Sequence, residues 1–417
     1  MSTAMSEKII LSALDIGTTK ICAIVGEYDR SVSEYRIRGI GKVPSSGMRG
    51  GVVIDIDQTR ASIEAAVSEA LNKAGIDKIS GVTVGIAGDH IRSMDTEHAI
   101  SINRPDNTKR VNIIDEKDMV RLEESIRNIN IGIDREIIHV IPQEYIINDQ
   151  VMVKNPIGMS GNKLTLKAHV ITAAINNARD LINCVQKTGL NVNDIVLEPL
   201  ASAEAVLTYD QKDLGVCLID IGGGTTDITI FRNGHLISTN IVGFGGEIIT
   251  RDIASLVQTS FLEAERIKKH YGWATAKLAK TEGAKEFYIK PVNGRTDIAI
   301  NSVQLSEFIE ARIREIFGFA RDHIKGYQLN AGVVLTGGGA LLRGIDQLAE
   351  ETFGMNCQVG FPIHLNGLEK EDFTPDFATA IGLLHSANKR NLKPKFPSGQ
   401  NKMTLWNKIK ERLSEFF

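Results

Sequence analysis

The segment Leu218–Phe231, with the sequence LIDIGGGTTDITIF, places three consecutive glycines between two apolar runs. The first run ends at Asp220, and the second begins after Asp227. This order predicts a buried strand, a tight turn and a second strand, with no side chains at the tip to block a ligand. Consecutive backbone N–H groups in such a turn form an anion-binding concavity, and flanking carboxylates suit hydrated Mg²⁺. An ordinary glycine-rich hairpin is the alternative that this segment alone leaves open.

A second copy of this pattern lies near the N-terminus, in the segment Ile10–Gly26. An apolar run there leads to Asp15, a glycine and two threonines, and another apolar run follows. Asp15 and Asp220 are separated by about half of the 417-residue chain. We therefore predict two similar halves that face each other across a cleft, each offering one glycine hairpin to the same phosphate chain.

Composition limits the class of protein. At roughly 150 residues per domain, the chain is long enough for two domains with sizeable cores. Apolar and charged contents of 42% and 24% are ordinary for a soluble globular protein. Residues 389–417 carry a net charge of +6, whereas the rest of the chain carries −9. The acidic body argues against general nucleic-acid binding, and the basic tail indicates a separate role for that segment.

The cysteines and histidines show no metal-binding spacing. The cysteines have apolar neighbours and form no CxxC pair, which predicts small core residues in a reducing cytosol. They are Cys22, Cys184, Cys217 and Cys357. The nine histidines form no HExxH motif, so a metal held directly by protein side chains is not expected. No apolar run reaches the ~18 residues of a transmembrane helix, and no signal peptide is recognisable. We therefore expect a cytoplasmic or peripheral protein.

Apolar periodicity predicts strands that alternate with helices. A helix that begins at about Asp57 carries an apolar stripe, and Gly75 is its expected C-cap. The longest predicted helix, Gln304–Ile324, has one continuous apolar face that we assign to the core. This alternation predicts an α/β fold with helices covering a mixed sheet. Neither GxxxxGK[ST] nor a GxGxxG after a strand occurs, so P-loop and Rossmann sites are not supported.

Residues 88–166 interrupt the alternation with polar turns and one charged helix, Asp115–Arg127. They also contain the run HVIPQEYIIND, which starts at His139. We interpret this region as a small inserted domain. The histidine and the glutamate of that run are candidates for catalysis, but a strand edge with a proline bulge is favoured. The regular α/β order is expected to resume with a strand at Lys167–Ala173.

The C-terminal segment predicts a linker and a membrane-binding helix. Residues 389–403 are polar and basic and contain two prolines, which is typical of a flexible linker. At ~100° per residue, the large apolar side chains of 404–417 share one arc with basic residues at its edges. This pattern is typical of an interfacial amphipathic helix on an anionic membrane surface. Docking on the protein's own core is the alternative. The predicted membrane-binding residues are Leu405, Trp406, Ile409, Lys410, Arg412, Leu413, Phe416 and Phe417.

Together these motifs resemble the actin superfamily, which includes sugar kinases and heat-shock chaperones, and within it the bacterial cell-division family FtsA. The resemblance rests on HVIPQEY, NPIGMSG, LGVCLIDIGGGTTDI, VVLTGGGALLRG and AIGLLH, and it spans the chain from Lys8 to Phe417. It implies an actin-like fold of two similar halves around a nucleotide cleft. The first half would comprise 8–87, 167–198 and 376–388, and the second 199–245 and 303–375. Residues 246–302 would form a small subdomain and 88–166 the inserted domain.

The resemblance also implies an ATP and Mg²⁺ site. Residues 17–19 and 222–226 would face the two sides of the phosphates, with Asp15 and Asp220 holding Mg²⁺ through water. Lys20 would add a positive charge, and residues 337–339 would let the backbone approach the nucleoside. The predicted cofactor-binding residues are Asp15, Gly17, Thr18, Thr19, Lys20, Asp220, Gly222, Gly223, Gly224, Thr225, Thr226, Gly246, Glu265, Lys268, Gly337, Gly338 and Gly339.

Two further roles are implied by the resemblance. Glu265 and Lys268 would contact ribose and adenine, although a solvated charged helix face explains their spacing equally well. Glu198 would orient the hydrolytic water, in a chain that is at most a slow ATPase.

The family further implies a protein that polymerises on the inner face of the cytoplasmic membrane, anchors the FtsZ ring and helps recruit later septum proteins. The inserted domain would lie at a longitudinal filament contact. The FtsZ tail would bind near 246–302, where Arg295 is a candidate contact. A small-molecule kinase of the same fold is the alternative, but it predicts an acceptor pocket in the cleft and gives the tail no role. A chaperone is disfavoured, because no β-rich substrate domain follows the nucleotide body.

Overall fold

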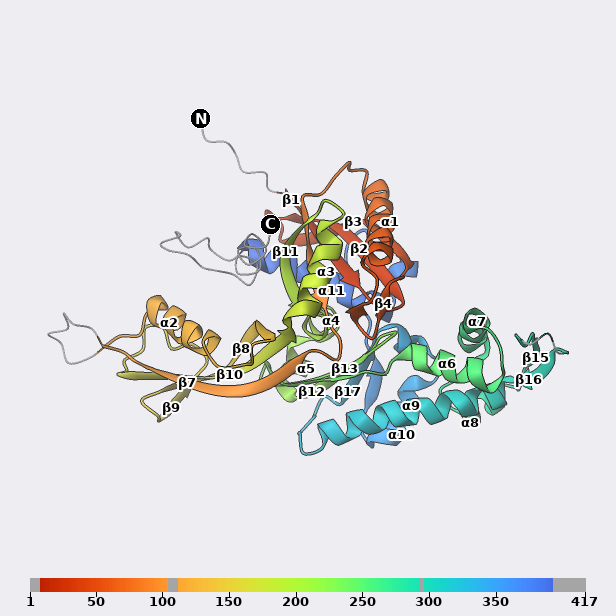
Figure 1. Cartoon of the computed structure of the whole chain (residues 1–417). Helices are drawn as coiled ribbons and strands as arrows, with labels where there is room; N and C mark the ends of the chain where they lie inside the picture. Colours follow the sequence, from red (N-terminus) through yellow and green to blue (C-terminus); the bar gives the residue numbers. More distant parts are fainter. Residues whose placement is uncertain (1–7, 104–111, 293, 295, 393–417) are drawn as a thin grey trace.

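The computed structural model describes residues 8–103, 112–292, 294 and 296–392. Two α/β halves, each built on a five-stranded sheet, form the body (Figure 1). A four-stranded domain extends from one side of the body, and a small subdomain extends from the other in this view (Figure 1). The α/β class expected from the apolar periodicity is confirmed.

The first half is built on a sheet with the order β11-β6-β1-β2-β3. Its strands are β1 (Lys8–Ile16), β2 (Lys20–Asp29), β3 (Glu34–Pro44), β6 (Gly81–Ile86) and β11 (Asn191–Leu197). The chain runs antiparallel from β1 to β2 and from β2 to β3, whereas β6 pairs parallel with both β1 and β11.

The second half repeats this arrangement in the order β18-β17-β12-β13-β14. Its strands are β12 (Val216–Ile221), β13 (Thr226–Arg232), β14 (His235–Val242), β17 (Val333–Thr336) and β18 (Cys357–Val359). Here too, the first three strands are antiparallel and the last two are added in parallel. The similarity of the two hairpins therefore extends to whole sheets, and the predicted pair of similar halves is confirmed.

The helices of the first half are α1 (Ile56–Ala74), α3 (Ile175–Gln186) and α11 (Ala378–Leu392), and α4 (Glu198–Val206) begins at the expected boundary and connects the two halves. Asp55 caps the start of α1, and Gly75 ends it in the left-handed conformation, as predicted. α11 packs on α4 and β1 and returns the chain to the first half. Because α11 continues to Leu392, it includes residues 389–392 that we expected in the linker.

The second half carries α5 (Tyr209–Leu214), α9 (Ser302–Ile324) and α10 (Ile345–Phe353). The predicted apolar face of α9 is buried in the core, including Ile309 and Phe317. The small subdomain consists of α6 (Gly246–Leu256), α7 (Phe261–Tyr271), α8 (Ala276–Thr281), β15 (Glu286–Ile289) and β16 (Ile298–Asn301). All four cysteines are buried free thiols, as expected for small core residues.

The inserted domain has a sheet of order β7-β10-β8-β9 covered by one helix, α2 (Glu116–Arg127). Its strands are β7 (Arg92–Ser101), β8 (Arg135–Ile147), β9 (Val151–Val153) and β10 (Lys163–Ala174). The strand that we expected to reopen the first half at Lys167 is the second part of β10, which pairs with β7 and β8. The boundary near 166 was therefore wrong, because the insert's sheet continues to the end of β10.

The run HVIPQEY lies inside β8, and the predicted proline bulge is confirmed. Pro142 is opposite Ala168 and Glu144 is opposite Lys167, so Gln143 is an extra residue on this strand. Glu144 forms an ion pair with Lys167 at 3.4 Å on an exposed part of the sheet.

The predicted amphipathic helix 404–417 and the FtsZ candidate Arg295 lie outside the described residues. Within the described part of the chain, no helix has both the length and the apolar character needed to cross a membrane.

Candidate functional site

The two glycine hairpins meet between the halves. In the β1–β2 turn, Gly17 N–H donates to the Lys20 carbonyl at 2.9 Å, and Gly222 N–H donates equivalently to Thr225 at 2.9 Å in the β12–β13 turn. A Cβ atom at Gly223 would lie only 2.4 Å from Thr19 Cγ2. The hairpins are therefore in direct contact, and the backbone at the tip can approach so closely only because the residue is glycine.

A short segment beside β4 (Met48–Arg49) joins this contact. Gly51 N–H donates to Thr18 Oγ1 at 3.0 Å. A Cβ atom at Gly224 would lie 2.4 Å from Thr18 Oγ1 and 3.1 Å from Gly50 Cα. Sequence reasoning missed this segment, although its GMRGG run was a visible signal.

The third glycine loop packs against the end of β12. A Cβ atom at Gly337 would lie 2.2 Å from Asp220 Oδ1, and one at Gly339 would lie 2.3 Å from Ile221 Cγ2. Two of the three glycines are thus required by contact with the second hairpin's own strand. Gly338 has more room, since its Cβ would meet Asp376 Cβ at 3.8 Å. The predicted approach of this loop to a nucleoside stays a prediction.

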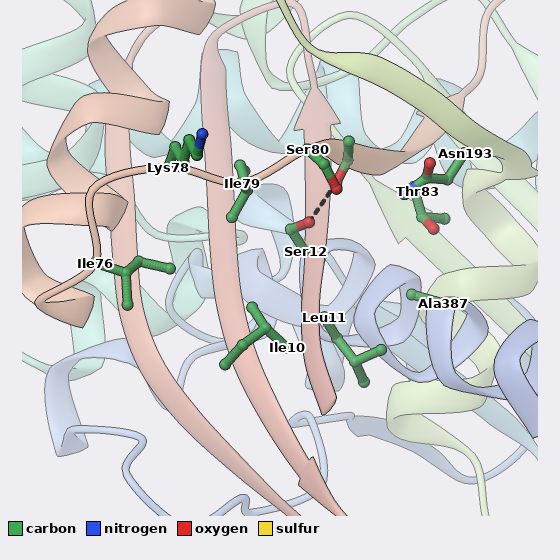
Figure 2. A pocket seen from close by; sticks show the side chains of 11 residues that line it. Ile10, Leu11, Ser12, Ile76, Lys78, Ile79, Ser80, Thr83, Asn193 and Ala387 are labelled. Carbon is green, nitrogen blue, oxygen red and sulfur yellow. Dashed lines mark hydrogen bonds between the residues drawn. The ribbon is translucent and has the colours of Figure 1, made fainter. Parts of the chain in front are cut away.

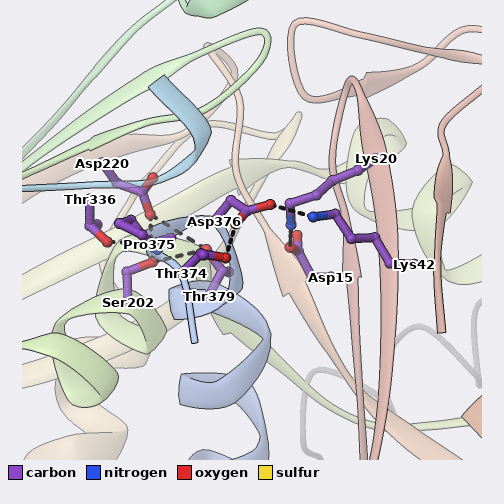
Figure 3. Close-up of polar contacts among 10 residues, drawn as sticks. All are labelled: Asp15, Lys20, Lys42, Ser202, Asp220, Thr336, Thr374, Pro375, Asp376 and Thr379. Carbon is purple, nitrogen blue, oxygen red and sulfur yellow. Dashed lines mark hydrogen bonds and ion pairs between the residues drawn. The ribbon is translucent and has the colours of Figure 1, made fainter. Parts of the chain in front are cut away.

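Asp15 and Lys20 form the polar part of the first hairpin (Figure 3). Lys20 Nζ lies 2.6 Å from Asp15 Oδ2. Burial acts to lower the pKa of Lys20, but the charge and hydrogen bond of Asp15, together with smaller effects of Cys22 and Asp376, raise the pKa above its usual value. Lys20 therefore remains a cation within the cleft.

Asp220 occupies the equivalent place in the second half (Figure 3). Its Oδ2 accepts hydrogen bonds from Ser202 Oγ at 2.6 Å and from Thr379 Oγ1 at 3.4 Å. These hydroxyls come from α4 and α11, the two helices that connect the halves. Burial raises the pKa of Asp220, and the negative charge of Asp15 adds to this effect.

Glu198 is the first residue of α4 and faces the same cluster. A Cβ atom at Gly85 would lie 2.8 Å from Glu198 Cγ, so the glycine makes room for this side chain. The pKa of Glu198 is raised well above its usual value, first by burial and then by the charges of Asp15, Asp227 and Asp220. The predicted water-orienting residue thus lies within electrostatic reach of both hairpins.

Asp227 completes the cluster and was not among the predicted site residues, although it flanks the glycine turn. It pairs directly across from Asp220 in the β12–β13 ladder and is buried. Among the described residues, its Oδ1 has no hydrogen-bond partner. Burial raises its pKa well above the usual range, and Asp220 adds to the shift. The available signal was a carboxylate at the start of an otherwise buried strand.

Four carboxylates and one lysine therefore lie together where the two hairpins meet. Within the described ranges, no group of three His, Cys, Asp or Glu side chains is arranged to hold a metal ion directly. Carboxylates that disfavour each other's ionisation nevertheless fit hydrated Mg²⁺, which keeps several of its waters.

Glu265 and Lys268 connect α7 to the second hairpin. Lys268 Nζ lies 2.6 Å from Glu265 Oε2 and donates to the Gly246 carbonyl at 3.0 Å. Gly246 N–H in turn donates to the Gly222 carbonyl at 2.8 Å. Burial acts to raise the pKa of Glu265, but the charge and hydrogen bond of Lys268, together with hydrogen bonds from Thr250 and Lys269, lower the pKa to about 2. The side chains of Lys268 and Glu265 are 14% and 28% exposed, so the pair is largely covered, and its contact with ribose and adenine stays a prediction.

Asp376 forms a further link that the sequence did not indicate. It lies in a short 3₁₀ turn, Pro375–Phe377, and its carboxylate accepts from Lys42 Nζ at 2.6 Å and from Thr374 Oγ1 at 2.6 Å (Figure 3). Thr336 Oγ1 donates to the Pro375 carbonyl at 3.3 Å. The turn thereby ties β3 of the first half to β17 of the second.

Comparison with known proteins assigns the chain. Residues 217–382 match a family model described as "Cell division protein FtsA", and residues 88–172 match the "SHS2 domain inserted in FTSA". A cell division protein FtsA of Neisseria meningitidis is 42% identical over 397 residues, covering 94% of this chain and 92% of the relative. The FtsA of Escherichia coli K12 is 32% identical over 405 residues, covering 94% and 93%.

The chain belongs to the FtsA family. It is therefore a cell-division protein, and the small-molecule kinase alternative is not favoured. The match of the inserted-domain model through residue 172 agrees with a sheet that extends past 166.

Solved structures agree on the fold of this FtsA family member. The PilM–PilN type IV pilus biogenesis complex aligns with a TM-score of 0.62 at 16% identity, covering 91% of this chain and 98% of that one. MreB5 of Spiroplasma citri bound to ADP aligns with a TM-score of 0.52 at 14% identity, covering 98% and 99%. The predicted actin-like fold is confirmed.

A cavity of about 500 Å³ lies outside the cleft, beside the amino-terminal part of β1 (Figure 2). Ser12, Lys78 and Asn193 are among its lining residues, and Ser12 Oγ donates to the Gly81 carbonyl at 2.6 Å. The carboxyl ends of β1, β6 and β11 carry the hairpin, Gly85 and Glu198, so this cavity is not part of the carboxylate cluster.

Proposed function

We propose that this cell-division protein binds ATP with Mg²⁺ between its two halves and that the bound nucleotide controls its assembly into filaments. The observation that carries the proposal is the direct contact of two equivalent glycine hairpins beside Lys20 and four carboxylates. Backbone N–H groups at the tips provide donors for phosphate oxygens, and Lys20 adds a cation.

Within this site, Asp15 and Asp220 would hold Mg²⁺ through water, and bound Mg²⁺ neutralises charge on the phosphates. Glu198, in its ionised form, would accept a hydrogen bond from the attacking water and take its proton late in phosphoryl transfer. Turnover is expected to be slow at most.

The nucleoside would lie against the second half. Glu265 and Lys268, held at the Gly246 carbonyl beside the second hairpin, would contact ribose and adenine. Residues 337–339 would border the base, with Gly338 the most open of the three.

Filaments of this protein would form on the cytoplasmic face of the inner membrane at the division site. The support is the amphipathic pattern of 404–417, the basic segment before it and membership of the FtsA family. One short helix binds a membrane weakly, and assembly multiplies the attachment. The inserted domain would contribute a filament contact. The small subdomain at about 246–302 would bind the FtsZ tail, and later division proteins would join the assembly.

The variant Gly223→Asp tests the nucleotide site. The new side chain would collide with Thr19, 2.4 Å from the Cβ position, and would place a negative charge against phosphate. We expect loss of binding of a fluorescent ATP analogue with Mg²⁺. Gly318→Asp in α9 is the matched control, because no atom lies within 4 Å of its Cβ position. Normal affinity in Gly223→Asp, with Gly318→Asp also normal, would refute the site.

A further inference from the structure

Strand β8 of the inserted domain contains two bulges. His139 is opposite Ile171 and Ile137 is opposite Thr172, so Ile138 has no partner on β10. The second bulge leaves Gln143 without a partner in the ladder. Bulges redirect side chains that would otherwise alternate regularly across a sheet.

The redirected side chains contact different halves of the body. Leu197 N–H, in the first half, donates to His139 Nε2 at 3.0 Å. Gln143 Nε2 donates to the carbonyl of Leu236, on β14 of the second half, at 3.3 Å. On the same strand, Ile138 and Ile141 pack against the core cluster that contains both of these leucines. One strand of the insert therefore spans the junction of the two halves.

Leu197 is the residue immediately before Glu198. It ends β11 and is the N-cap of α4, where no side chain caps the helix. Its N–H bond to His139 thus fixes the backbone at the point where α4 begins. That backbone sets where Glu198 enters the carboxylate cluster.

Additional contacts hold the insert to the second half. His169 Nε2 lies 3.0 Å from Thr239 Oγ1, and Ser93 Oγ donates to the Thr239 carbonyl at 3.1 Å. His169 is buried on β10, and its Nδ1 lies 2.7 Å from Asp95 Oδ1. Together with Gln143, these residues attach the insert to β14, whereas His139 attaches it to the start of α4.

We propose that β8 couples closure of the cleft to the position of the insert, with His139 as a positioning residue for Glu198. A change in the separation of Leu197 and Leu236 must move β8 or break one of its two bonds, because only three residues separate His139 from Gln143 and all three pair with β10. Nucleotide binding between the halves would therefore change the insert's attachment, and the insert's position would act back on Glu198. This inference rests on the proposed nucleotide site.

Hydrogen exchange of the full chain, with and without the ATP analogue AMPPNP and Mg²⁺, tests the coupling. In the wild type, we expect AMPPNP to change exchange in β8 and at Leu197, although β8 lies outside the proposed nucleotide contacts. His139→Phe removes the acceptor and should abolish the β8 response while leaving AMPPNP affinity nearly unchanged. Loss of this bond should also speed Leu197 exchange by roughly two- to tenfold.

Three variants make this test specific. His139→Gln restores an acceptor for Leu197 N–H and should recover the β8 response. His98→Phe makes the same substitution on β7, opposite Leu166, and should leave the response intact. Gln143→Leu removes the bond to the second half and so tests the other contact of β8. This variant keeps the proposal testable if His139→Phe does not fold.

The outcomes separate the two proposals. A wild-type chain that binds AMPPNP without any exchange change in β8 would overturn the coupling and leave the nucleotide site standing. A full response in both His139→Phe and Gln143→Leu would overturn it as well. A wild-type chain that fails to bind nucleotide would overturn the proposed function and the coupling together.

Discussion

Replacing Gly382 with alanine tests how closely the two connecting helices must cross beneath the cleft. A Cβ atom there would lie 1.8 Å from the Ala201 carbonyl oxygen and 2.3 Å from its carbon. Ordinary contacts begin near 3.4 Å, so α4 and α11 would have to separate by about 1.6 Å. Neither atom belongs to a flexible side chain, and the strain cannot be relieved by a rotamer change.

The separation would also disturb the hydrogen bonds to Asp220. Ser202 follows Ala201 on α4, and Thr379 precedes Gly382 on α11; both hydroxyls donate to Asp220 Oδ2. Overpacking costs about 1–3 kcal/mol, and leaving a buried acceptor unsatisfied costs about 1–3 kcal/mol more. We therefore expect Gly382→Ala to lower the free energy of unfolding by about 2–6 kcal/mol, a large share of the ~5–15 kcal/mol typical of native proteins.

Urea denaturation followed by circular dichroism measures this loss, and hydrogen exchange in α4 and α11 locates it. Gly318→Ala is the matched control, because its Cβ would have no neighbour within 4 Å inside α9. Alanine's higher helix propensity should make this control more stable by roughly 0.5–1 kcal/mol. The same substitution is thus expected to act in opposite directions at two helical sites. A Gly382→Ala variant as stable as wild type would refute the close-crossing argument.

Three further predictions concern charge and the tail. Lys268→Met should weaken AMPPNP binding and cost about 1–3 kcal/mol of stability, because it removes a largely buried partner of Glu265. Lys269→Met, at a side chain 72% exposed, should change stability by no more than ~0.5 kcal/mol; calorimetry compares the two, and equal effects would contradict the prediction. Folding raises the pKa of Asp227, so the folded state binds the carboxyl proton more tightly than the unfolded chain does. The contribution of Asp227 to the free energy of unfolding therefore falls as the pH rises above ~4. The stability of Asp227→Asn relative to wild type should therefore increase with pH in urea titrations, and a constant difference would exclude the linkage. The full chain should sediment with anionic liposomes, whereas Trp406→Glu and a chain cut near residue 400 should stay in the supernatant. Failure of the full chain to bind the liposomes with ATP present would refute the membrane proposal.

Several features of the site were predictable because they are encoded locally. The hairpins need glycine at their tips and apolar residues in their strands. The pattern around Asp15 and Asp220 can therefore be recognised from the sequence alone. The C-cap at Gly75 and the buried face of α9 likewise follow from periodicity and backbone conformation. Glu198 was expected from the family resemblance and lies within electrostatic reach of both hairpins, whereas its role in orienting water stays a prediction.

Other features depended on neighbours that are distant in the sequence. The charged spacing of Glu265 and Lys268 fits a solvated helix, but α6 covers the pair and supplies the Gly246 carbonyl. β10 has the apolar pattern of a body strand, yet its partners β7 and β8 belong to the insert. Sheet membership is a pairing property, and a strand's own residues do not specify it.

By itself, the sequence determined the two glycine hairpins, the α/β alternation, the inserted region and the amphipathic pattern of the tail. Each of these depends on backbone conformation or on the burial of one face, which act over a few residues. Only the tertiary structure decided that Asp227 joins the carboxylate cluster, that Ser202 and Thr379 hold Asp220, and that β8 contacts both halves. Those contacts form where segments far apart in the chain meet. The stability of each contact depends on a partner that cannot be predicted from the local sequence.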